Sequence, residues 1–122
     1  MRHTEIMAML AESELPVAYD HYAEGESPDP PFICFLYPYT NHFIADGRIY
    51  EKINVVHVEL YTDEKNPPLE ARVEKLLTEH ELFFHKSEVW IEEEKMYEVL
   101  YEVTIDLQYE EGPEGSESED NP

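Results

Sequence analysis

The stretch FIADGRIYEKINVVHVELYT, residues 43–62, decides the fold. Its Asp46-Gly47 dipeptide separates two apolar runs, and such a dipeptide is the preferred two-residue connection of a β-hairpin because both central positions need positive φ. After the turn the sequence alternates, and one face of the alternation carries Val56, Val58 and Leu60. The stretch therefore predicts a hairpin whose second strand is long and half-buried.

A helix is expected directly after this hairpin. Asn66-Pro67-Pro68 opens it, because Asn is a good N-cap and proline suits the first helical position. An amphipathic stripe at i, i+4, i+7 and i+8 follows, formed by Leu69, Val73, Leu76 and Leu77. The charged residues that lie off this stripe are Glu70, Arg72, Glu74 and Lys75. The helix should end near His80.

A shorter helix is expected before the hairpin, over residues 3–12, where one face carries Ile6, Met9 and Leu10. Strands are expected at 32–37, which is continuously apolar, and at 82–92 and 96–107, which are rich in aromatic and β-branched residues. Leu15 to Tyr19 is a candidate short strand. The predicted order is α-β-β-β-α-β-β: an α+β fold with a mainly antiparallel sheet, two helices on one face and a projecting β-hairpin.

The chain has 122 residues, enough for one domain with its own core. Its composition changes near Tyr109, since residues 109–122 hold six acidic residues and no basic one. Such a segment cannot bury enough apolar surface to offset its ordering entropy. We therefore expect a single α+β domain over residues 1–108 and a disordered acidic tail over residues 109–122.

The charge of the chain excludes several classes of partner. Eight Lys and Arg face 29 Asp and Glu, which gives a net charge of −21, and −15 without the six acids of the tail. Nucleic-acid phosphates and anionic membranes both demand basic side chains. No apolar run reaches the roughly 18–20 residues of a membrane span. A single cysteine and the lack of a signal-peptide pattern favour synthesis in a reducing cytoplasm.

No motif for catalysis or metal binding emerges. His80 and His85 are five residues apart, so they share no helix face and do not form a zinc-protease motif. Cys34 lies within the apolar run FICFLY, where a thiol is normally inert packing. Paired carboxylates are too common here to mark a site. We therefore expect no enzyme activity, no catalytic residue, no metal and no cofactor.

The aromatic hairpin is the more informative feature. Phe43, Ile44, Ile49 and Tyr50 crowd the two arms on either side of the turn. Either these side chains complete the core, or part of the hairpin projects and packs on another subunit, as exposed apolar clusters do at interfaces. We take these four residues as the candidate subunit interface, while both interpretations stay open at this point.

Three stretches together resemble a family of small proteins from the structural operons of long-tailed phages and prophages of Firmicutes. They are FLYPYTNHFIADGRIYEKIN (35–54), VELYTDEKNPPLEARVEKLL (58–77) and HKSEVWIEEEKMYEVLYEVTI (85–105). The resemblance covers roughly residues 32–106, and the acidic tail has no counterpart in it. The family is that of the tail terminator, or tail-to-head joining (tail completion) protein.

The resemblance implies a structural virion protein at the head-tail junction, made in the bacterial host cytoplasm. Such proteins form a homo-oligomeric ring, usually a hexamer, that caps the tail tube and docks to the head connector or stopper. DNA would pass through the lumen without specific binding, since a lumen lined by carboxylates repels phosphates. The implied partners are further copies of the chain, the tail tube protein and the connector, with no membrane.

A second function from another class fits the same charge. An acidic inhibitor encoded by a mobile element would mimic DNA and bind the basic groove of a nucleic-acid-binding protein. The acidic residues of this chain alternate with apolar ones instead of forming one marked row. This pattern favours the ring protein, and the DNA mimic is kept as the alternative.

Overall fold

The chain folds into two helices and one sheet over the residues that the structure describes. A computed structural model describes residues 2–23, 25–38, 41–45 and 47–111, with side chains outside 41–54 and 106–111. The bounds of the elements are α1 His3–Ala11, β1 Val17–Tyr19, β2 Phe32–Leu36, β3 Asn41–Ala45, β4 Arg48–Thr62, α2 Pro67–Glu79, β5 Phe83–Ile91 and β6 Met96–Glu111.

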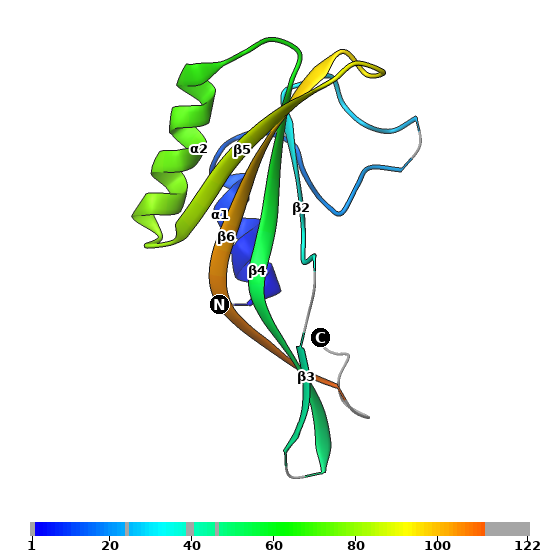
Figure 1. Cartoon of the computed structure of the whole chain (residues 1–122), viewed down its shortest axis with the longest axis vertical. Coiled ribbons are helices and arrows are strands. Elements are labelled where there is room, and N and C mark those ends of the chain that lie inside the picture. The colour runs from blue at the N-terminus through cyan, green and yellow to red at the C-terminus, as the bar shows by residue number, and fades with distance from the viewer. Residues whose placement is uncertain (1, 24, 39–40, 46, 112–122) are drawn as a thin grey trace.

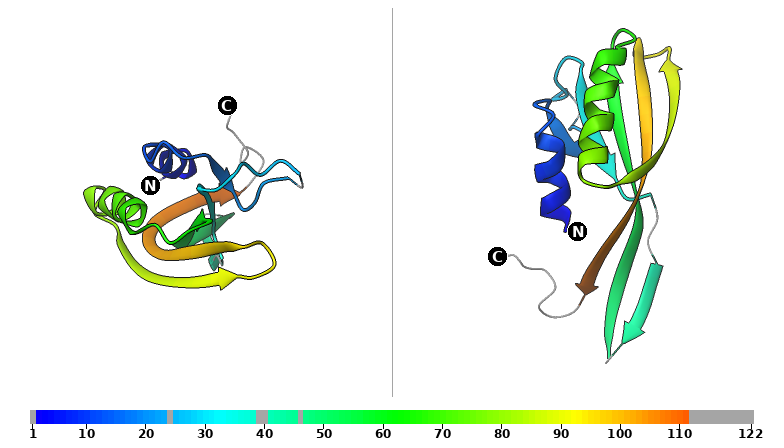
Figure 2. Two further views of the ribbon diagram at one scale, coloured as in Figure 1. Left: turned by 90° about the horizontal axis from the view of Figure 1, so that it is seen from above. Right: turned by 90° about the vertical axis from the view of Figure 1, so that its left-hand side faces the viewer.

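The six strands form a single sheet of order β1-β2-β4-β6-β5, and β3 pairs with β4 beside this path. All neighbouring strands are antiparallel except β1 and β2, which are parallel. Figures 1 and 2 show α1 and α2 against the same face of the sheet. The expected α+β class, with a mainly antiparallel sheet and both helices on one face, is confirmed.

The predicted strand order is roughly confirmed, with one short strand added. The candidate strand at Leu15 to Tyr19 is present as β1, so four strands precede α2, and the first arm of the predicted hairpin, β3, is separate from β2. β2 ends at Leu36, two residues before Pro38. Proline has no N–H to donate to a sheet, so β2 does not continue through this position into the hairpin.

The core fills the space between the helices and the sheet. Its members come from α1, α2 and the three central strands, and the strand residues are those that alternate toward the helices: Ile33, Phe35, Val56, Val58, Leu60, Val99, Tyr101, Val103 and Ile105. The cross-strand register places Val58 between Phe35 and Tyr101, all on this face. Each Å² of apolar surface removed from water contributes about 25 cal/mol to folding, so this layer is the main source of the protein's stability.

Helix α2 begins and ends where its sequence predicts. The Asn66 side chain accepts a hydrogen bond from the backbone N–H of Leu69 at 3.2 Å, and His80 caps the other end. Its apolar stripe is buried as expected. Glu70, however, was expected off the buried stripe, and it is 3% exposed.

Glu70 is buried because two lysines from other elements reach its carboxylate. Lys65 from the preceding loop lies 2.8 Å from it and Lys86 of β5 lies 2.9 Å from it. Burial alone would raise the pKa of Glu70, but the hydrogen bonds from the two lysines outweigh burial and hold that pKa below its usual range. Lys86 also contacts Glu74 at 2.7 Å. This cluster ties α2 to β5.

The β4–β6 pairing extends well beyond the helix-covered body. Its register steps from Ile53↔Leu107 to Val55↔Thr104, so β6 holds one residue more than β4 at this point. An extra residue of this kind bends the sheet and increases its twist. Below the bend, β4 and β6 continue away from the helices, together with β3 (Figure 1).

The boundary of the expected tail is corrected by the same pairing. Tyr109, Glu110 and Glu111 pair with β4 and belong to β6. They are ordered as a strand because β4 offers its free backbone groups opposite them, a partner that composition alone does not reveal. The rest of the expected tail, residues 112–122, lies outside the described residues.

Replacing Lys86 with Met should destabilise the protein. Glu70 would keep only one of its two cations, and removing a partner from a buried ion pair is costly, here about 1–3 kcal/mol of unfolding free energy because Lys65 remains. The loss should be largest above pH 5 and fade as the pH falls through the lowered pKa of Glu70, since the carboxylate is then neutral in both states. Urea unfolding at pH 7 and at low pH measures this change.

Lys75→Met is the matched control for this experiment. Lys75 lies on α2 and reaches Glu79 at 3.9 Å, but both side chains are largely exposed, so its loss should change stability by less than about 0.5 kcal/mol. Equal destabilisation by the two lysine variants would show that the buried cluster has no special role.

Candidate interaction surfaces

A three-stranded arm projects from the body of the protein. It consists of β3, the first part of β4 (residues 48–53) and the end of β6 (residues 107–111). Figures 1 and 2 show that neither helix covers it. The projecting hairpin expected from Asp46-Gly47 is thus present, and Gly47 has the positive φ of 76° that such a turn needs. A third strand, which the sequence did not predict, extends it.

The four candidate interface residues lie on this arm. Phe43 is opposite Tyr50 and Ile44 is opposite Ile49 in the register of β3 with β4. The two pairs occupy consecutive positions, which belong to opposite faces of a strand pair. The side chains of Phe43, Ile44, Ile49 and Tyr50 lie outside the described residues, so their role as a subunit interface stays a prediction.

The arm's hairpin also has no net charge, although the chain as a whole is strongly acidic. Residues 39–54 carry two acidic and two basic residues, and so have no net charge. The remaining residues up to 108 carry the whole −15 of the body. Copies of so acidic a protein repel one another, and a segment without net charge adds nothing to this repulsion.

The sheet face away from the helices forms a second surface, here called the open face. Three rows of cross-strand neighbours define it: Phe32, Tyr61 and Glu98; Cys34, Glu59 and Leu100; Leu36, His57 and Glu102. Tyr22, from the loop after β1, packs edge-on against the Phe32 ring, which stacks on Tyr61 at 5.1 Å. This loop therefore covers one end of the open face.

Glu59 is the most perturbed carboxylate of the open face. Burial and the neighbouring Glu98 carboxylate raise its pKa to about 7, although a hydrogen bond from the Tyr61 hydroxyl at 3.0 Å and the nearby His57 oppose the rise. Two carboxylates this close favour sharing a proton over ionising together. The side chains of His57 and Glu102 lie 3.3 Å apart in the next row.

Cys34 is buried beside these carboxylates, with 4% of its surface exposed. Burial and the negative charge of Glu59 raise the pKa of its thiol to about 11. A thiol with so high a pKa is a poor nucleophile at neutral pH. The prediction that Cys34 is a buried packing residue is confirmed.

The two histidines singled out in the sequence are not brought together into a site. His80 caps α2 and its ring lies 3.4 Å from the Glu12 carboxylate, whereas His85 lies on β5 opposite Glu102. Within the described residues, no group of three or more His, Cys, Asp or Glu has the arrangement of a metal site.

Strand β5 is a surface that the sequence analysis did not single out. Four large apolar side chains are exposed among the described residues, and three of them lie on β5: Phe83 (83% exposed), Val89 (53%) and Trp90 (41%). In the part of the chain that the structure describes, β5 is the last strand of the sheet and pairs with β6 alone. The aromatic composition of residues 82–92 predicted a strand, but only the sheet order places that strand at an edge.

Replacing Glu59 with Gln should stabilise the protein at high pH. The folded pKa of about 7 lies above the unfolded value of roughly 4.3, so an ionised Glu59 opposes folding, and the cost grows from pH 4 to pH 7 and is complete above it. Allowing for partial exposure to water, we expect a gain of about 1–2 kcal/mol in unfolding free energy at pH 8 and less than half of that at pH 5. Chemical denaturation at both pH values measures the difference.

Glu93→Gln provides the control, because Glu93 is exposed in the turn between β5 and β6 and its replacement changes the net charge equally. A gain from Glu59→Gln that does not grow with pH would contradict the shared-proton interpretation of the open face.

Comparison with known proteins adds no family to this description. No family model matches the chain, and no curated protein matches it. Among the described residues, no helix is long and apolar enough to cross a membrane. Two surfaces remain for a functional interpretation. One is the projecting arm, and the other is edge strand β5 with its three exposed apolar side chains.

Proposed function

We propose that this chain is a structural virion protein, a ring-forming tail terminator that caps the tail tube and joins it to the head connector. The observation that carries the proposal is the three-stranded arm, which extends past the body without covering any of the chain's own core (Figure 1). A projecting arm whose hairpin is rich in apolar residues and has no net charge suits contact with another subunit.

A head-to-tail contact between identical subunits closes naturally into a ring. The arm of one copy and a different surface of the next form such a contact. Six copies are the size implied by the resemblance to tail terminators. The acidic body then lines or borders a channel in which DNA phosphates find few cations, so DNA passes without tight, salt-dependent binding.

The proposed role needs assembly only, and no catalytic step. Further copies of the chain, the tail tube protein and the head connector are its partners, and the head-tail junction is its place in the virion. All three of these partners are proteins. The acidity of the chain is compatible with them, although it excludes nucleic acid as a ligand.

The acidic DNA mimic remains the second candidate, favoured by the net charge of −21. Such a mimic needs carboxylates that stay ionised and unpaired at neutral pH, in place of phosphates. On the open face, Glu59 has its pKa raised to about 7 and Glu102 lies 3.3 Å from His57. The open face therefore offers fewer ionised carboxylates without a side-chain partner than its sequence suggests, which favours the ring protein.

Deleting the gene from its parent phage tests the two candidates against each other. A tail terminator predicts loss of infectious particles, with headless or abnormally long tails in electron micrographs. Normal particles that contain no copy of this chain by mass spectrometry would overturn the proposal, and lost inhibition of a host nucleic-acid-binding protein would favour the mimic.

Charging the arm should block ring formation. Ile44→Asp with Ile49→Asp adds two negative charges at neighbouring positions of the uncharged hairpin, which should abolish the ring in native mass spectrometry or on isolated tails. The fold should persist, with unfolding free energy changed by less than about 1 kcal/mol, because the arm lies outside the core.

Ala23→Asp with Ser27→Asp adds the same charge to an exposed loop and serves as the control. A ring that survives in the arm variant, or is lost equally in the loop variant, would exclude the arm as the contact.

A further inference from the structure

Edge strand β5 has the features of a surface that another strand covers. It has nine residues and pairs on one side only, so the backbone N–H and C=O groups of its other side have no strand partner among the described residues. Proteins normally protect such an edge with charges, prolines or a covering segment. β5 instead exposes Phe83, Val89 and Trp90.

The charges of β5 are neutralised within the body. Its sequence, FFHKSEVWI, holds one lysine and one acidic residue. Lys86 is paired with Glu70 and Glu74 of α2, and Glu88 is paired with Lys65. β5 therefore offers a second copy of this strongly acidic chain a strand without net charge, as the hairpin of the arm does.

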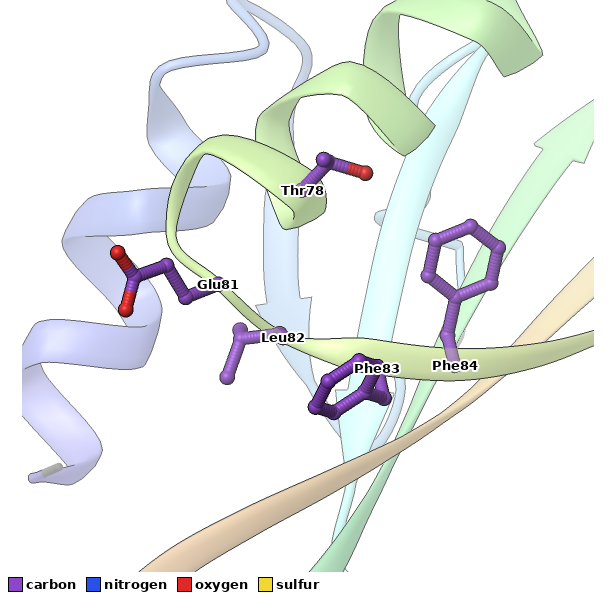
Figure 3. A pocket seen from close by; sticks show the side chains of 5 residues that line it. All are labelled: Thr78, Glu81, Leu82, Phe83 and Phe84. Carbon is purple, nitrogen blue, oxygen red and sulfur yellow. The ribbon is translucent and has the colours of Figure 1, made fainter.

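A depression of about 570 Å³ adjoins the beginning of β5. Its lining residues are Thr78, Glu81, Leu82, Phe83 and Phe84 (Figure 3). The Phe84 side chain packs against the core and meets the Tyr101 ring edge-on at 5.3 Å. The Phe83 side chain points away from the core and is largely exposed to solvent. A strand laid along β5 would cover Phe83 and place its own side chains beside this depression.

We propose that β5 receives the arm of the next copy, with β3 added to it as a further strand of the sheet. The proposal rests on the proposed function, since it names the second surface of the ring contact. β3 is a free edge as well: among the described residues it pairs with β4 alone, and its sequence NHFIA has no acidic or basic residue other than His42. Strand addition satisfies the backbone groups of both edges, and the two neutral surfaces avoid the repulsion between acidic bodies.

The arm cannot cover the β5 of its own chain. Figures 1 and 2 show the arm extending below the body, while β5 runs along the far side of the sheet next to α2. The two edges are different surfaces, so each copy adds its β3 to the β5 of one neighbour and accepts the β3 of another neighbour along its own β5. This is the head-to-tail geometry that produces a ring or a filament, and it differs from a symmetric dimer formed by two β5 strands.

Cysteine cross-linking tests which edges meet. Ser87→Cys marks the middle of β5 and Ile44→Cys marks β3, each in the Cys34→Ser background. A short bifunctional thiol reagent tolerates neighbouring registers of the two strands. We expect a cross-linked dimer when the two variants are mixed at high concentration and little dimer from either variant alone.

The outcomes separate this proposal from the ring itself. A dimer formed by the Ser87→Cys variant alone, as readily as by the mixture, would show a symmetric β5 contact and overturn the proposal. A ring seen by native mass spectrometry without any cross-link would overturn β5 as the receiving edge and leave the proposed function standing. Cross-linked pairs that never close into a ring would support the edge pairing and contradict the proposed function. Neither a ring nor a cross-link would overturn both.

A charge placed on β5 gives an independent measurement. Val89→Lys should weaken assembly about tenfold or more in concentration, since a lysine on an edge strand opposes strand addition. Ala11→Lys adds the same charge at the exposed end of α1 and should leave assembly unchanged. Equal assembly of the two lysine variants would argue against β5.

Discussion

The pairing of β4 with β6 is the constraint on which the rest of the structure depends. It begins in the body, where both strands carry core residues such as Val58 and Tyr101, and continues without a break into the arm. The arm is therefore an extension of the core sheet and not a loop attached to it. Its direction is set by the bend between Ile53 and Val55, where β6 holds one residue more.

Scarce cations shape how this acidic chain holds together. Only eight Lys and Arg balance 29 acids. Two of them, Lys65 and Lys86, are used at one place, where they allow the Glu70 carboxylate to be buried between α2 and β5. Two others, Arg48 and Lys52, balance Asp46 and Glu51 in the hairpin of the arm. The cations thus gather where elements, and in our proposal subunits, have to approach one another.

The open face shows how a sheet tolerates acids on its uncovered side. Glu59 has its pKa raised by burial and by Glu98, and the thiol of Cys34 beside it stays protonated for the same two reasons, burial and neighbouring negative charge. The face therefore loses charge through protonation instead of through basic partners. This costs stability at high pH but avoids drawing lysines away from the α2–β5 cluster.

The sequence by itself determined the elements that rest on local signals. Asn66-Pro67-Pro68 and the stripe from Leu69 to Leu77 fixed α2, because caps and a 3.6-residue period act within a few residues. The Asp46-Gly47 turn fixed the hairpin, and the alternation after it predicted the face that carries Val56, Val58 and Leu60. The α+β class followed from the order of these elements.

Only the tertiary structure decided which residues meet across the sheet. Strand order made β5 an edge, and it placed Glu98 near Glu59, although 39 positions separate them in the chain. Residues 109–111 have the composition of a tail, yet they form a strand because β4 lies opposite them. The sequence places Glu70 off the apolar stripe of α2, but in the structure it is buried because Lys65 and Lys86 from other elements pair with it. In each case the deciding partner is distant in sequence, and a local pattern carries no information about it.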